Sequence, residues 1–296
     1  MPKFGASTYC LNKKITSGEY SPVQAFERLC DLGAQVVEIC PIGFDTSEDP
    51  ALCEALAKAS RERGIPLGNY SAGSSFILLT DEQFDANIAK AKKHVDAAAS
   101  MGIRTIRFDC AYANRPISEN TPEHFDEELP DIVKGYRILC DYAKQSGITI
   151  QIENHGYHAN GAERVRRIIT AVGRGNFGHQ LDVGNYICVD DVPEMSVRKM
   201  IGFATTIHMK DFYVRSGNRF IEASDGGHCI WFGTSGGRRL RGSILGQGDL
   251  DIPDIMKVIK DSGYDGNIML EFEGVEDCDY ATGKSIAYMK QLWDNI

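Results

Sequence analysis

Four side chains that can bind a metal stand in successive apolar runs of the second half of the chain. They are Glu153 in QIENHG, Asp182 in HQLDVGN, His208 in TTIHMKD and Glu271 in IMLEFEG. Three carboxylates and an imidazole at close range need a cation between them, because like charges raise one another's pKa values. Carboxylate oxygen and one histidine nitrogen, without a thiolate, suit Mn²⁺, Mg²⁺, Co²⁺ or Zn²⁺. The pattern predicts one divalent metal ion, and we favour Mn²⁺.

The elements that would carry these residues follow a repeated pattern, in which a short apolar run is followed by a longer amphipathic stretch closed by glycine. Gly33 precedes AQVVEIC, Gly102 precedes IRTIRFD and Gly147 precedes ITIQIEN. A glycine just past a helix adopts the left-handed conformation that ends it, and the apolar run behind it is typical of a buried parallel strand. Proline directly after a capping residue, as at Pro22 and Pro50, marks helix starts.

Eight strands are predicted in this way, and eight parallel strands that alternate with helices favour a closed (β/α)8 TIM barrel. The predicted ranges are 4–10, 35–40, 65–70, 103–109, 148–154, 178–183, 204–209 and 267–272. A doubly wound open sheet would normally carry a glycine-rich phosphate turn after its first strand, and LNKKITSGEY has none. No linker divides the chain, so we expect a single domain over residues 1–296. Its enlarged loop at about 211–250 is interpreted as a lid or substrate loop.

The four metal-binding side chains fall at the ends of predicted strands five to eight. Active sites of such barrels lie at the C-terminal ends of the strands, so these residues should meet at one part of the rim. Taken alone, an acidic residue at a strand end is more often a helix cap or an ion-pair partner, and a lone histidine is more often a core residue. Their occurrence on four successive strands favours the metal site.

The charge balance argues against a nucleic-acid partner. The chain has 32 basic and 41 acidic residues, a net charge of −9, which repels a phosphate backbone. The dense basic cluster GGRRLRG at 236–242 would either hold a small anionic or hydroxylated ligand or form a solvated loop. No apolar run reaches the roughly 18 to 20 residues of a membrane span, and the N-terminus lacks a signal-peptide pattern. We expect a cytoplasmic protein without a membrane partner.

The order of the motifs resembles the xylose-isomerase-like TIM barrel family, a group of sugar isomerases and epimerases that includes tagatose 3-epimerase, hydroxypyruvate isomerase and inosose dehydratase. The matching pieces are IENHG, LDVGN, HMKD, LGQGDLDIP and GYDGNIMLEFEG, so the C-terminal half matches closely and the N-terminal half only in its rhythm. The resemblance implies that Glu153, Asp182, His208 and Glu271 are metal ligands. It further implies that Glu153 and Glu271 act as an acid/base pair.

The activity that this resemblance implies is proton abstraction alpha to a carbonyl of a sugar or cyclitol through an enediolate. Return of the proton to the opposite face gives epimerisation, return to the neighbouring carbon gives isomerisation, and loss of a β-hydroxyl gives dehydration. An inosose dehydratase or a 3-oxo-glycoside deglycosidase is the alternative of the lyase class. A carbohydrate-binding barrel without chemistry is a third reading. Members of the family often associate, so a homo-oligomer is a further expectation.

Substrate contacts are expected from side chains near the same rim. The candidates are His155, Asn185, Arg241, Lys210, Trp231, Glu38 and Arg107. Asn185 stands where tagatose-epimerase-like members carry a histidine, and Lys210 fits the family's HxKD pattern. Arg107 could instead form a structural ion pair with Asp109, and Trp231 could be a packing residue rather than a lid aromatic. The related endonuclease IV, with its three zinc ions, would need more histidines than this site offers.

Overall fold

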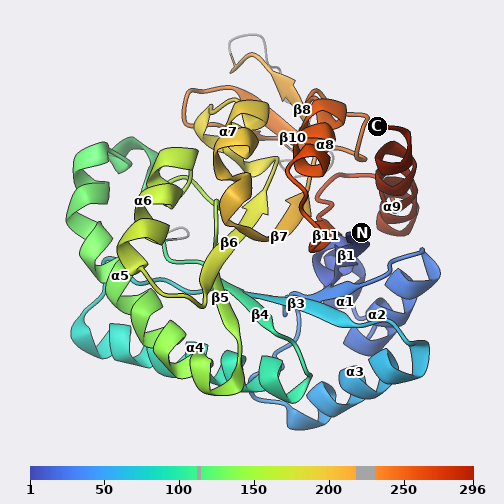
Figure 1. Ribbon diagram of the computed structural model, residues 1–296, viewed down its shortest axis with the longest axis horizontal. Coiled ribbons are helices and arrows are strands. Elements are labelled where there is room, and N and C mark those ends of the chain that lie inside the picture. Colours follow the sequence, from blue (N-terminus) through green and yellow to red (C-terminus); the bar gives the residue numbers. More distant parts are fainter. Residues whose placement is uncertain (112–114, 218–230) are drawn as a thin grey trace.

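A closed barrel of eight parallel strands forms the centre of the protein, as a computed structural model shows for residues 1–111, 115–217 and 231–296 (Figure 1). The barrel strands are β1 (Lys3–Ser7), β2 (Val37–Ile39), β3 (Leu67–Ala72), β4 (Thr105–Phe108), β5 (Thr149–Glu153), β6 (Phe177–Asp182), β7 (Ala204–Met209) and β11 (Asn267–Leu270). They close in the order β1-β11-β7-β6-β5-β4-β3-β2. The predicted (β/α)8 TIM barrel is confirmed.

Helices surround the barrel strands in the described part of the chain (Figure 1). They are α1 (Asn12–Thr16), α2 (Pro22–Asp31), α3 (Pro50–Arg63), α4 (Asp81–Ser100), α5 (Pro122–Ala143), α6 (Ala162–Val172), α7 (Pro193–Met200), α8 (Ile252–Asp261) and α9 (Cys278–Asn295). None of the helices among these residues is both long enough and apolar enough to cross a membrane.

The helix starts and ends follow from local sequence signals. Proline occupies the first turn of α2 and α3, where the missing N–H costs no hydrogen bond, and the preceding Ser21 and Asp49 side chains cap Gln24 N and Leu52 N. Gly64 ends α3 with φ of 65°. Only glycine reaches this left-handed conformation without steric strain, so the chain turns there toward β3.

The first strand is shorter than predicted. The expected range 4–10 ends at Ser7, because Thr8–Leu11 form a 3₁₀ helix that the Ser7 hydroxyl caps through Tyr9 N at 3.2 Å. Cys10 and Leu11 are buried by this turn as they would have been in a strand. Burial alone therefore could not distinguish the two conformations in the sequence.

A small antiparallel sheet lies within the segment expected to be an irregular loop at about 211–250. Its strands are β8 (Phe212–Arg215), β10 (Arg239–Gly242) and β9 (Phe232–Gly233), paired in the order β8-β10-β9. These runs are too short to show a strand period in the sequence. Residues 218–230 of the segment lie outside the described part of the chain.

Polar side chains meet across the inside of the barrel. Asn69 on β3 donates to Gln180 Oε1 on β6 at 2.5 Å, although these strands are not neighbours in the ring. Glu38 on β2 contacts His208 on β7 at 2.8 Å in the same way. Aliphatic side chains usually fill the interior of such barrels. The polar layer here indicates the level of the barrel at which charged side chains are accommodated.

We predict that Gly5→Ala destabilises the barrel by about 2 to 3 kcal/mol, the upper part of the range for overpacking. A Cβ on Gly5 in β1 would lie 1.9 Å from the carbonyl oxygen of Val36, a backbone atom that cannot move aside. Chemical denaturation measures the difference. Gly175→Ala is the control, because a Cβ there meets no atom within 4 Å. Equal stability of the two variants would show that the β1 backbone shifts freely.

Candidate metal centre

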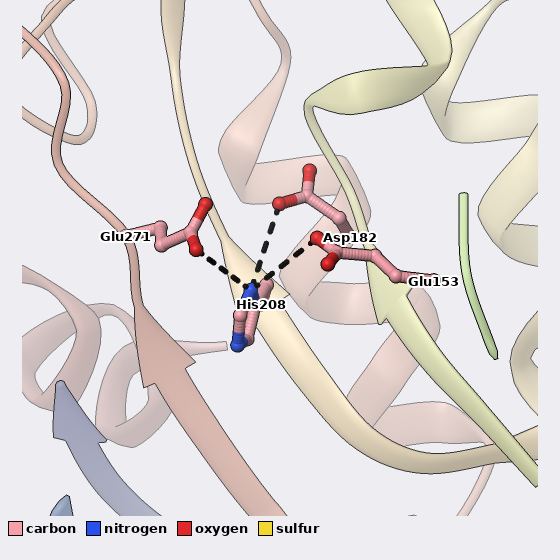
Figure 2. A group of neighbouring side chains, drawn as sticks. All are labelled: Glu153, Asp182, His208 and Glu271. Carbon is pink, nitrogen blue, oxygen red and sulfur yellow. Dashed lines mark ion pairs between the residues drawn. The ribbon is translucent and has the colours of Figure 1, made fainter. Parts of the chain in front are cut away.

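The four predicted ligands converge at one point at the C-terminal ends of β5, β6, β7 and β11. One ligand atom from each of Glu153, Asp182, His208 and Glu271 lies within 4.8 Å of the others. Figure 2 shows the three carboxylates pointing at His208 Nδ1 from different strands. The distances to that nitrogen are 3.6 Å from Glu153 Oε1, 3.9 Å from Asp182 Oδ2 and 3.5 Å from Glu271 Oε1.

Asp182 presents an unsatisfied oxygen to this cluster. Its Oδ1 accepts hydrogen bonds from the backbone N–H groups of Gly184 and Asn185 at 2.8 and 2.7 Å, whereas its buried Oδ2 accepts none from the described residues. Burial raises the pKa of Asp182 to about 6, and the neighbouring carboxylates Glu153 and Glu271 add to the effect. A buried carboxylate oxygen without a donor is the arrangement expected where a cation binds.

His208 is held by a carboxylate on its far side. Its Nε2 lies 2.8 Å from Glu38 Oε2, and both side chains are fully buried. Because a carboxylate only accepts hydrogen bonds, Nε2 carries the proton, and Nδ1 faces the three carboxylates of the cluster. Burial opposes a charge on His208, but Glu38 and Glu271 nevertheless raise the pKa of this imidazole well above its ordinary value. A divalent cation would take the place of the Nδ1 proton.

Glu153 is surrounded by donors. Its Oε2 lies 2.8 Å from Arg107 Nε and accepts from Gln180 Nε2 at 3.2 Å, and its Oε1 accepts from Asn185 Nδ2 at 3.3 Å. Although burial opposes ionisation, Arg107 holds the pKa of Glu153 well below its usual range. Glu153 therefore remains a carboxylate with one oxygen committed to Arg107 and the other facing the cluster.

Glu271 differs from Glu153 because it lines a cavity. The cavity has a volume of about 460 Å³, and its walls also include Tyr9, Cys40, Ser71, Arg107, Asp109, His155, Lys210 and Glu273. Lys210 Nζ lies 2.6 Å from Glu271 Oε2 and 3.6 Å from Asp182 Oδ2. Burial opposes the charge of Lys210, but Glu271 and Glu273 raise the pKa of the ammonium well above its ordinary value, so it remains charged.

The other expected substrate contacts fall into two groups. Arg107, His155 and Lys210 line the cavity, whereas Asn185 is 3% exposed and bridges Lys210 Nζ to Glu153. Asn185 is therefore buried and is not among the described residues that line the cavity.

Glu38 likewise lies beside His208 rather than in the cavity wall. Arg241 stacks over the ring of Tyr213 on β8 at 4.7 Å and over the ring of Trp231, the residue before β9, at 5.5 Å. The alternative reading of Arg107 as an ion-pair partner of Asp109 is seen at 2.8 Å, beside its contact with Glu153.

Several site residues were missed in the sequence. Gln180 precedes Asp182 by two positions, and Glu273 follows Glu271 by two, so each pair lies on one face of an extended chain. That period-two spacing was a usable signal. Asn69 precedes Ser71, which lines the cavity, by the same two positions, whereas Tyr9 has no acidic or basic residue within three positions of it.

The chain belongs to the xylose isomerase-like TIM barrel family, whose family model matches residues 26–292. A curated relative is inosose dehydratase from Lacticaseibacillus casei, which is 24% identical over 202 residues. The match covers 66% of this chain and 66% of the relative, just under two thirds of the relative's length.

Solved structures share the fold over nearly the whole chain. The IolI protein with a bound zinc atom has a TM-score of 0.74 at 17% identity, over 99% of this chain and 98% of that one. D-psicose 3-epimerase, solved in the presence of D-fructose, has a TM-score of 0.72 at 17% identity, over 98% of this chain and 99% of that one.

We predict that Glu38→Gln weakens divalent-metal binding by about 10- to 100-fold, the usual effect of losing the partner of a metal-binding histidine. Glutamine keeps the shape of the side chain but removes the charge that holds the Nε2 proton of His208. Competition with a chelating dye measures the affinity for Mn²⁺ and Zn²⁺. The exposed Glu54→Gln on α3 serves as the control. An affinity within twofold of the wild type would show that Glu38 does not orient His208.

Proposed function

We propose that the protein is a divalent-metal-dependent sugar isomerase or epimerase that removes the proton alpha to a carbonyl and proceeds through an enediolate. The observation that carries the proposal is the buried cluster of three carboxylates and one imidazole at the edge of a cavity with the volume of a small-molecule site. The substrate would be a small sugar or cyclitol. Family membership supports an enzyme of sugar chemistry.

The metal would be held by Glu153 Oε1, Asp182 Oδ2, His208 Nδ1 and Glu271 Oε1. Three oxygen ligands and one imidazole suit Mn²⁺, which we favour, as well as Mg²⁺, Co²⁺ and Zn²⁺. The unsatisfied Asp182 Oδ2 supports this ligand set. When bound, a divalent cation would polarise the carbonyl and an adjacent hydroxyl and so acidify the C–H bond between them.

Side chains of the protein would carry out the proton removal and stabilise the charge that develops on the substrate. Glu271 is the ligand that lines the cavity, so we assign it the removal of the proton. Lys210 and Arg107 also line the cavity as permanent cations, and they would stabilise the negative charge that develops on the substrate oxygens. Glu153 Oε2 lies 2.8 Å from Arg107 Nε, just as Glu271 Oε2 lies 2.6 Å from Lys210 Nζ, so we keep Glu153 together with Glu271 as the acid/base pair that the resemblance implies, in addition to their role as metal ligands.

A lyase is the second candidate. The curated relative is an inosose dehydratase, which favours a cyclitol substrate that loses a β-hydroxyl after the same proton removal. A deglycosidase of 3-oxo-glycosides would use the same first step. A binding barrel without chemistry receives less support, because it would not need a proton acceptor in the cavity wall.

The test is deuterium incorporation from D₂O by the Mn²⁺-loaded protein into D-fructose, D-psicose and an inosose. We expect one metal ion per chain by mass spectrometry and label at the carbon beside the carbonyl. The labelled product separates epimerase, isomerase and dehydratase. Absence of both bound metal and label would contradict the proposal and favour a binding role.

We further predict that Glu271→Gln lowers the rate of deuterium incorporation by at least about 100-fold, the range for loss of a general base. Glutamine retains an oxygen that can face the metal, so the metal content should fall much less than the rate. Glu163→Gln, on an exposed part of α6, is the matched control. Incorporation at the wild-type rate in Glu271→Gln would exclude Glu271 as the base.

A further inference from the structure

A sugar isomerase or epimerase can act on free sugars or on sugar phosphates, and the charge of its cavity wall decides between them. We infer that this cavity selects an uncharged polyhydroxylated substrate, and that Glu273 is the residue that binds one of its hydroxyls and excludes anionic analogues. This inference rests on the proposed function, because it names the class of substrate that the same cavity would take.

Arg107 is one of two permanent cations in the described cavity wall, and it already has carboxylate partners. Its Nη1 lies 2.8 Å from Asp109 Oδ2, and its Nε lies 2.8 Å from Glu153 Oε2. The Arg107 side chain is only 7% exposed. Two carboxylates thus more than neutralise the guanidinium, and a phosphate would have to displace one of them to pair with it.

Lys210 is the other permanent cation of this wall. Its Nζ lies 2.6 Å from Glu271 Oε2, 3.6 Å from Asp182 Oδ2 and 3.7 Å from Glu273 Oε2. The Lys210 side chain is 3% exposed. Three carboxylates therefore surround a single positive charge, and their repulsion of an incoming phosphate offsets the attraction of the ammonium.

Carboxylates outnumber permanent cations in the described part of the site. The six carboxylates in the cavity wall and the adjoining cluster belong to Asp109, Glu271, Glu273, Glu38, Glu153 and Asp182. Arg107 and Lys210 supply two positive charges, and a bound divalent cation would supply two more. The excess of negative charge remains whether or not His155 carries a proton. An anionic substrate would add to this excess in a place largely removed from water.

The other described residues of the cavity wall carry no charge. They are Tyr9, Asn12, Cys40, Pro41, Ile42, Ser71 and Gly73. Arg241 is not among them, and it stacks over the ring of Tyr213 and lies 3.9 Å from Glu276. A phosphate at a carbon distant from the carbonyl would therefore meet neutral groups or carboxylates in this wall. Substrate hydroxyls, in contrast, can form hydrogen bonds with side chains such as Asn12 and Ser71.

Glu273 is the carboxylate of this wall with an oxygen available to a ligand. Its Oε2 accepts from the Tyr9 hydroxyl at 3.5 Å and lies 3.7 Å from Lys210 Nζ, whereas none of the described residues forms a hydrogen bond or ion pair with Oε1. The Glu273 side chain is 23% exposed, compared with 7% for Glu271 and 8% for Asp109. A carboxylate oxygen in this position accepts a hydrogen bond from a hydroxyl and repels a second anion.

We predict that the Mn²⁺-loaded protein binds neutral ligands at least about 100-fold more tightly than their phosphate esters, because like charges placed together in a binding site are strongly unfavourable. The probes are D-fructose and D-psicose with their 6-phosphates, and myo-inositol with its 1-phosphate. Titration calorimetry measures the affinities. The free Mn²⁺ concentration is held constant, because phosphate esters also bind this ion.

Glu273→Gln should weaken the binding of the neutral ligands by about tenfold, because a hydrogen bond to a charged acceptor is lost. The phosphate esters should bind to this variant at least as well as to the wild type, so the ratio of the two affinities falls. Glu273→Asp keeps the charge and should still exclude the phosphates. Glu62→Gln, exposed on α3, is the matched control for the change in net charge. The metal content should be the same in all variants, since Glu273 is not assigned as a ligand.

Three results would overturn the inference. They are a phosphate ester that binds the wild type as tightly as its neutral partner, the absence of binding by every neutral probe, and an unchanged ratio of affinities in Glu273→Gln. A failure of the proposed function looks different. Neutral sugars would then bind in preference to their phosphates but take up no deuterium from D₂O, which contradicts the proton abstraction and leaves the charge selection intact.

Discussion

The burial of several carboxylates at one point is the constraint on which the rest of the site depends. Glu38, Glu153, Asp182 and Glu271 are all at most 7% exposed. Charged groups removed from water must be paired, because desolvation otherwise outweighs any local attraction. Arg107 and Lys210 supply two permanent cations, and His208 supplies a nitrogen between the carboxylates. One further divalent cation would complete this neutralisation.

The polar layer inside the barrel is a consequence of that constraint. Asn69 donates to Gln180 from another side of the ring, and Gln180 in turn donates to Glu153. Glu38 contacts His208 across the ring. The layer therefore contacts two of the proposed ligands. An aliphatic layer would pack equally well, but it could not fix which oxygen or nitrogen of each ligand faces the cluster. In this barrel, polar side chains that orient the proposed ligands replace part of the aliphatic interior that such barrels usually have.

Glu153 and Glu271 are the same residue type, but their surroundings in the cluster differ. Arg107 and Gln180 engage Glu153, whereas Glu271 opens onto the cavity beside Lys210. Each of these two proposed ligands is thus paired with a different cation, Glu153 with Arg107 and Glu271 with Lys210. His155 and Asp109, whose Nδ1 and Oδ1 atoms lie 2.9 Å apart, line the same cavity as Glu271.

The sequence by itself determined the barrel and the four side chains that converge, because hydrophobic runs, helix caps and terminal glycines are local signals and strand ends meet at one rim. Strand limits shifted where burial did not distinguish conformations, as at Thr8–Leu11. The partners of each polar residue are seen only in the folded chain. Glu38 contacts His208, Asn185 contacts Glu153, and His155 is paired with Asp109. These contacts join residues that are distant in sequence, and no local pattern encodes them.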